Sequence, residues 1–362
     1  MMINKIKNVP NQKTVDLAYL KSSELPLFLY GTGSYATDVK QFLDKHAIYL
    51  DGVVLDETYY KDDLFFEDYK VQLLHNVLSN YATVNIIIAF SEYRDRIAAL
   101  TSHPQVARCM FIDAPNLEDH FFDYEYIKKD YSIWAELYEK LEDDHSRQVL
   151  VAFINAKISG FPGDLYDLNV KGEKQYFPSF LRLSDSEVFV DCGAFDGDTI
   201  LEFDKQTAGK YNQIYAFECD PVNIGKLKNN VGKLNNVEII QKGCFSRKGI
   251  LSFSNRGSGI SKIEENGNFQ IEIDAIDNMI SNKEVSFIKM DIEGAELEAL
   301  KGAKSVITKK CPQLAISVYH KPEDLITIPQ YILLLNKNYK IYLRHYGYNS
   351  WETILYAINT KL

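Results

Sequence analysis

The sequence predicts an α/β protein made of two Rossmann-like domains joined by a helical segment. In both halves, short apolar runs that end in an acid or a glycine turn alternate with stretches of helical periodicity. Such alternation is typical of mostly parallel sheets. With 362 residues, the chain is also long enough for two domains of about 100–200 residues each. We expect a first domain over 1–118, a helical connector that could carry a lid over 119–183, and a second domain over 184–362.

The charge balance argues against nucleic acid as a partner. The formal net charge is −10, and lysines and arginines are scattered among acids instead of forming a basic stripe. The N-terminus has no apolar signal core, and no apolar run reaches the roughly 18 residues that a membrane span needs. We therefore expect a cytoplasmic protein without a membrane span.

The cysteines fit the same compartment. They are odd in number and show no CxxC spacing, which favours a reducing environment. We interpret them as small buried apolar residues and not as metal ligands or nucleophiles. The five are Cys109, Cys192, Cys219, Cys244 and Cys311.

The first domain begins after a polar lead-in over residues 1–24. Its pattern is a βαβ series with an amphipathic segment over 71–78 and a helix that ends at Leu43. The expected strands are Leu27–Tyr30, Gly52–Leu55 and Asn85–Ala89.

A glycine turn follows the first of these strands. Gly31, Gly33 and Ala36 fit the GxGxxG/A pattern, and Asp56 lies near the ribose-binding place of a dinucleotide fold. The turn indicates either a nucleotide or nucleotide-sugar site, or a tight turn kept for packing alone. A nicotinamide dehydrogenase is disfavoured, because this half has no companion catalytic set.

The connector should form two helices. Aromatic and aliphatic residues recur at helical spacing from Glu118 to Ile158, with a break near 143–146 where Asp144 or Ser146 could cap the second helix. The Trp and Tyr stripe indicates core or a dimer interface, so a homo-oligomer is one option. Further on, Gln175–Pro178 could form a lid over a ligand, or an ordinary interdomain turn.

The rest of the chain is organised around Glu187–Thr199, which reads EVFVDCGAFDGDT. A buried strand, a glycine turn and a helix start present backbone N–H groups to a ligand. Asp196 and Asp198 would repel a pyrophosphate, so this loop suits a cationic, zwitterionic ligand better. S-adenosylmethionine is the commonest such cofactor.

The second domain continues this alternation. The expected strands lie over 213–217, 237–240, 285–290, 314–318, 340–343 and 353–358, and a β excursion over 249–253 and 270–273. A helix is expected over 295–307, and the loop 255–261 could border a pocket. Ligands of such a sheet sit beyond the carboxyl ends of its strands. Polar residues that follow successive strands should therefore meet at one rim: Asp191, Glu218, Asp291, Glu293 and His320.

These motifs resemble a known family. The runs VDCGAFDGDT, YAFECDP, FIKMDIEGAELEALKGA, LAISVYHKPEDL and YLRHYGYNSWETILYAI resemble the FkbM-type S-adenosylmethionine-dependent O-methyltransferases. The resemblance covers Gln175 to Ile358, including the upstream QYF segment. It departs at Cys219, where many members have proline. It implies a seven-stranded class I methyltransferase fold with a reversed last strand.

The resemblance also implies roles for particular residues. Glu218 would hold the ribose, Cys244 would lie near adenine, and Asp291 would face the sulfonium and the acceptor. The cofactor would be contacted by Gln175, Tyr176, Asp191, Gly193, Ala194, Phe195, Asp196, Gly197, Thr199, Glu218, Cys219, Cys244 and Asp291. Tyr319, Arg344 and His345 would contact the acceptor, although the last two could also be a satisfied strand end, and Glu352 could pair with Arg344.

Methyl transfer to an alcohol requires a group that removes the hydroxyl proton. We expect His320 to be this base, because histidine titrates near ~6.5, with Asp291 or Glu293 orienting it or taking the proton. As a second option, Asp291, Glu293 and His320 could hold Mg²⁺. The two acids could also cap the following helix.

The resemblance implies a sugar or glycan hydroxyl as acceptor, often in the biosynthesis of a surface polysaccharide. S-adenosylhomocysteine would be the product. The alternative from another class is a non-catalytic module that binds a nucleotide or other ligand, or holds partners in a biosynthetic complex.

Overall fold

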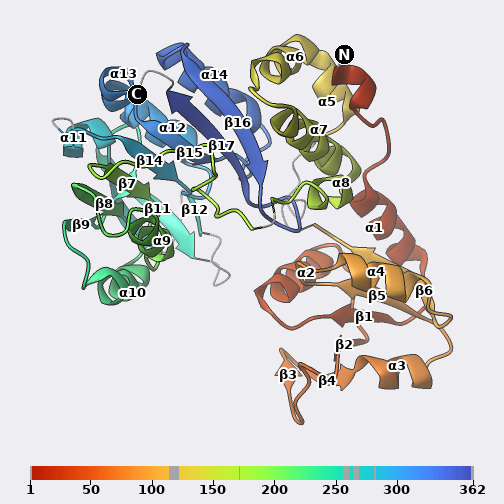
Figure 1. Cartoon of the computed structure of the whole chain (residues 1–362). Coiled ribbons are helices and arrows are strands. Elements are labelled where there is room, and N and C mark those ends of the chain that lie inside the picture. The colour runs from red at the N-terminus through yellow and green to blue at the C-terminus, as the bar shows by residue number, and fades with distance from the viewer. Residues whose placement is uncertain are drawn as a thin grey trace. The chain divides into compact units, whose positions relative to one another are not determined.

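The computed structural model of the chain describes residues 2–113, 122–170, 172–255, 261–263, 269–280 and 283–359. The described chain divides into two compact units (Figure 1). Unit 1 comprises residues 1–131, 150–169 and 347–351, and unit 2 comprises 132–149, 170–346 and 352–362. Each unit therefore contains segments that are distant in sequence.

Unit 1 is built on a six-stranded sheet. All its neighbouring strands pair in parallel except one edge hairpin. Its strands in spatial order are β3 (Phe65–Phe66), β4 (Tyr69–Leu73), β2 (Gly52–Leu55), β1 (Leu27–Tyr30), β5 (Val84–Ile88) and β6 (Val106–Phe111). Its sequence also forms η1 (Met2–Lys5), α1 (Gln12–Ser22), α2 (Ser34–Lys45), α3 (Leu74–Asn80) and α4 (Arg94–Thr101).

The expected strands of the first domain are confirmed, but other elements differ. The polar lead-in contains α1, which Asn11 caps by accepting a hydrogen bond from the Lys13 N–H at 3.0 Å. The amphipathic segment 71–78 is divided between the end of β4 and the start of α3. The apolar spacing in this segment did not distinguish a strand from a helix, because the segment contains the end of one and the start of the other.

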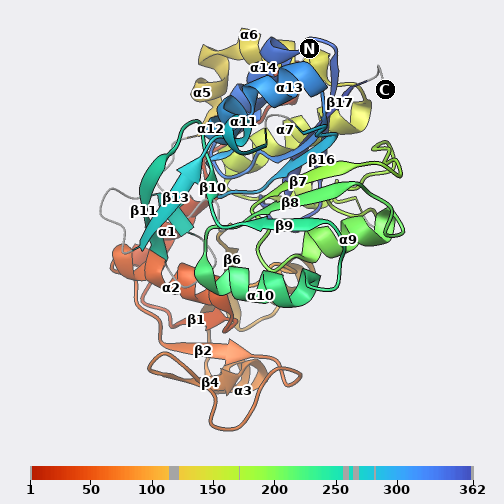
Figure 2. The ribbon, with the colours of Figure 1, turned by 90° about the vertical axis from the view of Figure 1, so that its left-hand side faces the viewer.

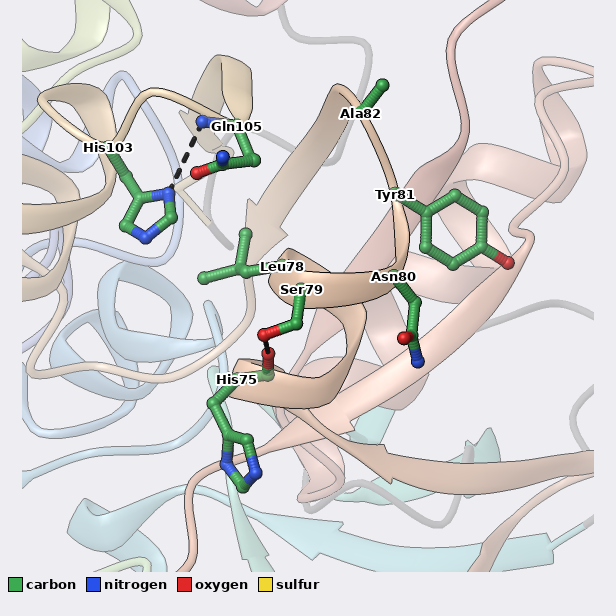
Figure 3. Close-up of a pocket in the computed structure, with 8 residues that line it drawn as sticks. All are labelled: His75, Leu78, Ser79, Asn80, Tyr81, Ala82, His103 and Gln105. Atoms are coloured by element: carbon green, nitrogen blue, oxygen red, sulfur yellow. Dashed lines mark hydrogen bonds between the residues drawn. The ribbon is translucent and has the colours of Figure 1, made fainter.

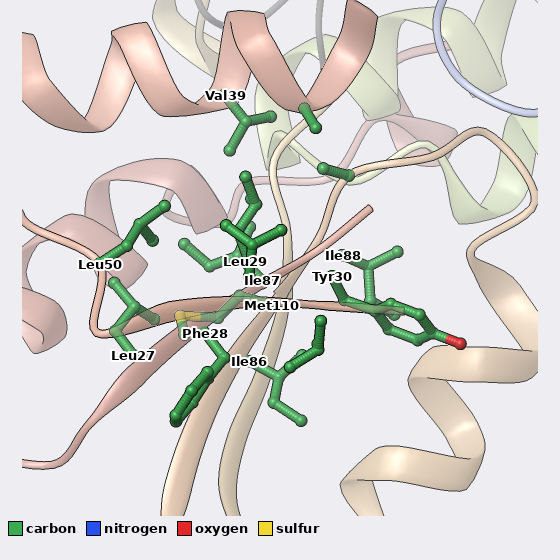
Figure 4. Close-up of a cluster of buried hydrophobic side chains, with 14 of the residues drawn as sticks. Leu27, Phe28, Leu29, Tyr30, Val39, Leu50, Ile86, Ile87, Ile88 and Met110 are labelled. Carbon is green, nitrogen blue, oxygen red and sulfur yellow. The ribbon is translucent and has the colours of Figure 1, made fainter. Parts of the chain in front are cut away.

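The centre of unit 1 is a buried apolar cluster. Every residue of β1 and β5 is buried, and Figure 4 shows their side chains beside Val39 of α2. Strands covered on both faces read as continuous apolar runs and not as alternating ones. This is why LFLY and NIIIA predicted central strands.

The helical region holds α5 (Tyr124–Lys129), α6 (Tyr131–Lys140), α7 (Asp144–Ser159) and α8 (Gly163–Tyr166). The predicted break near 143–146 is confirmed, but both predicted caps are wrong. The Asp143 carboxylate accepts a hydrogen bond from the Ser146 N–H at 2.7 Å, so Asp143 caps α7. Trp134 is 2% exposed, so it contributes to the core.

Unit 2 contains the predicted seven-stranded sheet. Its spatial order is β16 (Tyr339–His345), β17 (Thr353–Asn359), β15 (Gln313–Ser317), β14 (Phe287–Met290), β7 (Val188–Cys192), β8 (Gln213–Phe217) and β9 (Val237–Ile240). Among the described strands of this sheet, only β17 is antiparallel to its neighbours. The expected reversed last strand is confirmed.

Helices cover both faces of this sheet. In Figure 2, α9 and α10 lie on one face and α12, α13 and α14 on the other. The helices are α9 (Asp198–Gln206), α10 (Pro221–Val231), α11 (Ile276–Ile280), α12 (Glu296–Gly302), α13 (Lys304–Lys310) and α14 (Asp324–Leu335). None of the helices in the described ranges is long and apolar enough to cross a membrane.

The predicted β excursion forms a separate four-stranded sheet. Its order is β10 (Gly243–Cys244), β13 (Phe269–Asp274), β11 (Gly249–Asn255) and β12 (Ser261–Ile263). Most of the loop 255–261, which we expected to border a pocket, lies outside the described residues.

One long helix was predicted wrongly. The segment 295–307 forms α12 and α13, which are separated at Ala303. Gly302 ends α12 where the chain packs so closely that a Cβ there would lie 1.9 Å from the carbonyl oxygen of Phe245. This contact with a distant segment, which sequence periodicity does not report, accompanies the break.

The core of unit 2 gives a test of packing. The Phe189 ring on β7 stacks on Phe203 at 4.6 Å and on Phe287 at 5.0 Å, and it is fully buried. We expect Phe189→Ala to lower the free energy of unfolding by about 3–5 kcal/mol, because it removes the ring and leaves a cavity. Urea denaturation followed by circular dichroism would measure this. Val222→Ala, at a site that is 67% exposed, is the control, with an expected change below about 0.5 kcal/mol. A loss below about 1 kcal/mol for Phe189→Ala would contradict the packing argument.

Candidate active site

The candidate site lies at the carboxyl ends of four neighbouring strands of unit 2. These are β15, β14, β7 and β8, which are adjacent in the sheet. Asp291 follows β14, Tyr319 and His320 follow β15, and Glu218 follows β8. The glycine loop follows β7. The fold therefore brings the ends that carry these residues to one edge.

The glycine loop is fixed by its neighbours. Gly193 has φ +80°, and a Cβ there would lie 2.0 Å from the carbonyl oxygen of Asp291. The N–H groups of Gly193 and Ala194 each donate to the carbonyl oxygen of Phe217 at 2.9 Å. Only glycine fits this close approach of two strand ends.

Glu218 is tied to the same loop. One carboxylate oxygen accepts the Phe195 N–H at 2.9 Å and the other accepts the Asp220 N–H at 2.8 Å. Burial raises the pKa of Glu218, although these backbone donors oppose the shift. A carboxylate can accept about four hydrogen bonds, so beyond these two donors and the backbone of Cys219 it can still accept one from a hydroxyl group.

Asp191 has a cationic partner within the chain. Its Oδ1 lies 2.9 Å from Nζ of Lys289, and both side chains are at most 4% exposed. Lys289 Nζ also donates to the Gly193 carbonyl oxygen at 2.8 Å. Burial raises the pKa of Asp191 to about 6, although Lys289 opposes the shift. The resemblance implies that Asp191 contacts the cofactor, and in the structure its partner is Lys289, which also binds the loop.

A single imidazole lies among three carboxylates. His320 Nδ1 is 3.0 Å from Oε1 of Glu296, and Nε2 is 3.5 Å from Asp291 and 3.6 Å from Glu293. Burial lowers the pKa of His320, but these acids outweigh it and raise the value to about 10. The ring is therefore positively charged near neutral pH and is not the neutral base that its ordinary pKa predicts.

The pKa values of two neighbouring acids are shifted in opposite directions. Burial opposes ionisation of Asp291, but the charges of His320 and Lys289 hold its pKa below the usual range. Burial raises the pKa of Glu293 to about 7.

Two tyrosines complete the wall around Asp291. The hydroxyl of Tyr176 donates to Asp291 Oδ2 at 2.8 Å, and that of Tyr319 donates to Oδ1 at 3.2 Å. The Tyr176 N–H donates to the hydroxyl of Tyr356 at 3.1 Å. The segment predicted as a lid thus reaches the acids through Tyr176 and Gln175, whose amide donates to the carboxylate of Glu352.

Sequence reasoning missed three charged residues here: Lys289, Glu296 and Glu352. Lys289 lies inside an apolar strand, and Glu296 lies on the helix that follows the strand end. Burial and the charge of Asp291 raise the pKa of Glu352 to about 7. Glu352 directly precedes β17. Because this strand is reversed, its amino end lies where the other strands have their carboxyl ends, so the expected reversal could have placed Glu352 in the site.

Unusual backbone conformations gather at the same edge. Four residues other than glycine that have positive φ lie in this site: Tyr176 (+69°), Phe195 (+48°), Glu293 (+56°) and Glu352 (+63°). Such residues cost of order 1–3 kcal/mol each and cluster at functional sites. The presence of four such residues at one sheet edge indicates that this edge has a functional role in addition to packing.

Two of the predicted substrate contacts lie elsewhere. The Arg344 guanidinium pairs with Asp143 at 2.7 Å and not with Glu352. His345 is fully buried, with Nδ1 2.9 Å from the hydroxyl of Thr353. Both side chains have partners near β16 and β17. They are therefore better described as paired residues at a strand end than as contacts of an acceptor.

The remaining loop residues and cysteines have local partners. The Asp196 carbonyl oxygen accepts a hydrogen bond from Asn230, and Thr199 is buried in the first turn of α9. The sulfur of Cys244 lies 3.3 Å from that of Cys192. Burial raises the pKa of Cys219 to about 12 and that of Cys244 well above its ordinary value, so both stay thiols.

The glycine turn of unit 1 shows contacts that a packing role requires. A Cβ on Gly31 would lie 2.7 Å from the Ala89 carbonyl oxygen. Asp56 pairs with Arg96 at 2.6 Å and accepts a hydrogen bond from Tyr30. These contacts favour the packing alternative over a ribose contact.

Unit 1 also has an open hollow of about 510 Å³ (Figure 3). His75, Ser79 and Asn80 line it from α3, together with Tyr81, His103 and Gln105. These residues precede β5 and β6, so the hollow is at the amino ends of the strands. Ligands of parallel sheets bind at the opposite edge.

The residues of unit 2 fit S-adenosylmethionine by their chemistry. A glycine loop adjoins the carboxylate of Glu218, and an excess of carboxylates gathers at the same sheet edge, which suits a cationic ligand. Together with the strand order, these features define a methyltransferase domain of the class I fold.

Residues 191–349 match the family model of the methyltransferase FkbM domain. The chain therefore contains an FkbM methyltransferase domain, as its motifs predicted, and it is an S-adenosylmethionine-dependent methyltransferase. None of the curated proteins matches the sequence.

The fold is shared with a solved structure over nearly its whole length. The methyltransferase FkbM from Methylobacillus flagellatus is 23% identical, with a TM-score of 0.78 over 98% of this chain and 95% of that one. An rRNA methylase from Streptococcus thermophilus is 16% identical over 49% of this chain and 88% of its own, with a TM-score of 0.33. Fibrillarin from Aeropyrum pernix, in complex with S-adenosyl-L-methionine, is 12% identical over 49% and 70%, with a TM-score of 0.31. These two low scores mark a distant likeness only.

The buried pair beneath the loop makes a sharp prediction. We expect Lys289→Met to lower the free energy of unfolding by about 3–5 kcal/mol, because it leaves the buried charge of Asp191 without its partner. Denaturation with urea would measure the change.

The control for this variant is Lys301→Met, which removes an exposed pair with Glu298 and should cost less than about 1 kcal/mol. The double variant Asp191→Asn with Lys289→Met should recover part of the loss. Equal effects of Lys289→Met and Lys301→Met would show that the buried pair does not hold the loop.

Proposed function

We propose that this protein transfers the methyl group of S-adenosylmethionine to a sugar hydroxyl, in a glycan or a nucleotide sugar. The observation that carries the proposal is the His320 cluster, which lies at the same sheet edge as the glycine loop. A neutral hydroxyl acceptor needs both a proton acceptor and stabilisation of developing negative charge. The cluster holds carboxylates for the first task and a positively charged imidazole for the second.

The cofactor, when bound, supplies an electrophilic methyl group on a positively charged sulfur. In our proposal the glycine loop 193–197 lies against it and the carboxylate of Glu218 binds it, with Cys244 near the adenine. Asp291, held ionised by its neighbours, faces the acceptor side together with the hydroxyls of Tyr176 and Tyr319.

The proposed proton acceptor is a carboxylate. Asp291 and Glu293 both lie near Nε2 of His320, and Glu293, whose pKa burial raises to about 7, is the better acceptor of the hydroxyl proton. The charged ring would stabilise the oxygen that loses this proton. His320 thus acts through its charge and its position, which revises the role of neutral base that its ordinary pKa predicts.

The choice of a sugar rests on the family resemblance and on the chemistry of the rim. Tyrosine rings and hydroxyls are common walls of sugar sites, and two of them border Asp291. We propose synthesis of a surface polysaccharide, in the cytoplasm, as the setting. The second candidate function is a non-catalytic binding or scaffolding module. Its supporting observations are that Asp191 and Asp56 already have cationic partners within the chain, Lys289 and Arg96.

Cofactor binding is the first test. We expect isothermal titration to give micromolar dissociation constants for S-adenosylmethionine and S-adenosylhomocysteine, about −8 kcal/mol. Glu218→Ala should weaken both at least about tenfold, because a buried hydrogen-bonding carboxylate is lost. Glu238→Ala, on the exposed side of β9, is the matched control and should bind as the parent protein does. A folded protein that binds neither ligand would favour the scaffolding module.

The role of His320 is tested separately. We expect His320→Ala to keep cofactor affinity within about threefold while methyl transfer to a responsive nucleotide sugar or glycan falls about 100-fold or more. The measurement is turnover of radiolabelled methyl groups alongside titration with S-adenosylhomocysteine. Retained turnover would remove His320 from the mechanism.

A further inference from the structure

Three residues of the site come from three different elements and meet at one point. Asp291 follows β14, Glu296 begins α12, and His320 follows β15. One ligand atom from each side chain lies within 4.8 Å of the other two. We propose that Asp291, Glu296 and His320 bind a divalent transition-metal ion of the Mn²⁺ type.

Glu296 gives an independent observation in favour of an ion. Its side chain is fully buried, and its Oε1 accepts the Ile292 N–H at 2.9 Å and lies 3.0 Å from His320 Nδ1. Its Oε2 accepts no hydrogen bond from any residue in the described part of the chain. A buried carboxylate oxygen that lacks a donor is costly, and a cation is the partner that satisfies it best.

The spacing is close to what coordination requires. With metal–ligand bonds of about 2.1 Å, adjacent ligand atoms lie about 3.0–3.5 Å apart and opposite ones about 4.2 Å apart. His320 offers one ring nitrogen to an ion: Nδ1 lies 3.0 Å from Glu296, and Nε2 lies 3.5 Å from Asp291. The widest separation, up to 4.8 Å, would need to shorten by only about 0.6 Å.

The donor set selects the class of ion. Imidazole nitrogen suits transition metals, carboxylate oxygen suits Mg²⁺, Ca²⁺ and Mn²⁺, and of these three Mn²⁺ is the transition metal. Two carboxylates with one imidazole therefore favour Mn²⁺ over the Mg²⁺ that the sequence suggested. Glu293 is a candidate fourth ligand, because its Oε2 lies 3.6 Å from His320 Nε2 and its side chain is 40% exposed.

The ion would lie among these acids, beside the imidazole of His320. A divalent ion there would supply more positive charge at the edge where the acceptor is proposed to bind, and could lower the pKa of its hydroxyl. This catalytic role rests on the proposed function, whereas binding of the ion does not.

The test is titration of the purified, chelator-treated protein with Mn²⁺, followed by electron paramagnetic resonance of the free ion and by calorimetry. We expect one Mn²⁺ per chain. Glu296→Gln and Asp291→Asn should each weaken binding about 10-fold to 100-fold. Tenfold more Mg²⁺ should not displace the Mn²⁺.

Glu298→Gln is the matched control, because Glu298 lies on the same helix but contacts Ser246 and Lys301. It should bind Mn²⁺ as the parent does. A parent protein without bound Mn²⁺, equal binding by a folded Glu296→Gln protein, or displacement by Mg²⁺ would overturn the proposal. Titration of S-adenosylhomocysteine in the presence of chelator then separates the two proposals, because cofactor binding without Mn²⁺ binding would leave the methyltransferase function standing.

Discussion

The ion pair between Asp191 and Lys289 is the constraint on which the site depends. It joins β7 to β14 below the glycine loop, and the same ammonium group holds the carbonyl oxygen of Gly193. The loop then packs so tightly against the end of β14 that a side chain on Gly193 would collide with Asp291. Because breaking a buried pair leaves an uncompensated charge, the two strand ends and the loop are held as one unit.

Much of this arrangement could be predicted from the sequence because strand ends obey a topological rule. Continuous apolar runs identified the central strands, and each run that ends in a polar residue delivers it to the same edge. Nε2 of His320 indeed lies 3.5 Å from Asp291 and 3.6 Å from Glu293. Arg344 and His345 also end a strand, but β16 is at the sheet edge, where their partners are Asp143 and Thr353.

Other features depend on contacts that sequence spacing does not report. The pKa of His320 follows from three acids around the ring, one of which, Glu296, belongs to the next helix. Glu352 reaches the site because β17 runs in reverse, so its amino end lies at the edge where parallel strands end. The break between α12 and α13 coincides with the contact of Gly302 with Phe245. In each case the feature depends on contacts between segments that are distant in sequence, which the local sequence pattern does not contain.

The reversed strand has a consequence for how the protein can be divided. The family match ends at residue 349, whereas β17 spans Thr353–Asn359 and pairs with both β15 and β16. A fragment trimmed to the match would leave β15 with a bare apolar edge and β16 without its neighbour. Unpaired edges of this kind recruit strands from other molecules, so the fragment should aggregate. The chain also passes between the two units after residues 131, 149, 169, 346 and 351. The methyltransferase domain is thus a recognisable stretch of sequence without being a separable piece of protein.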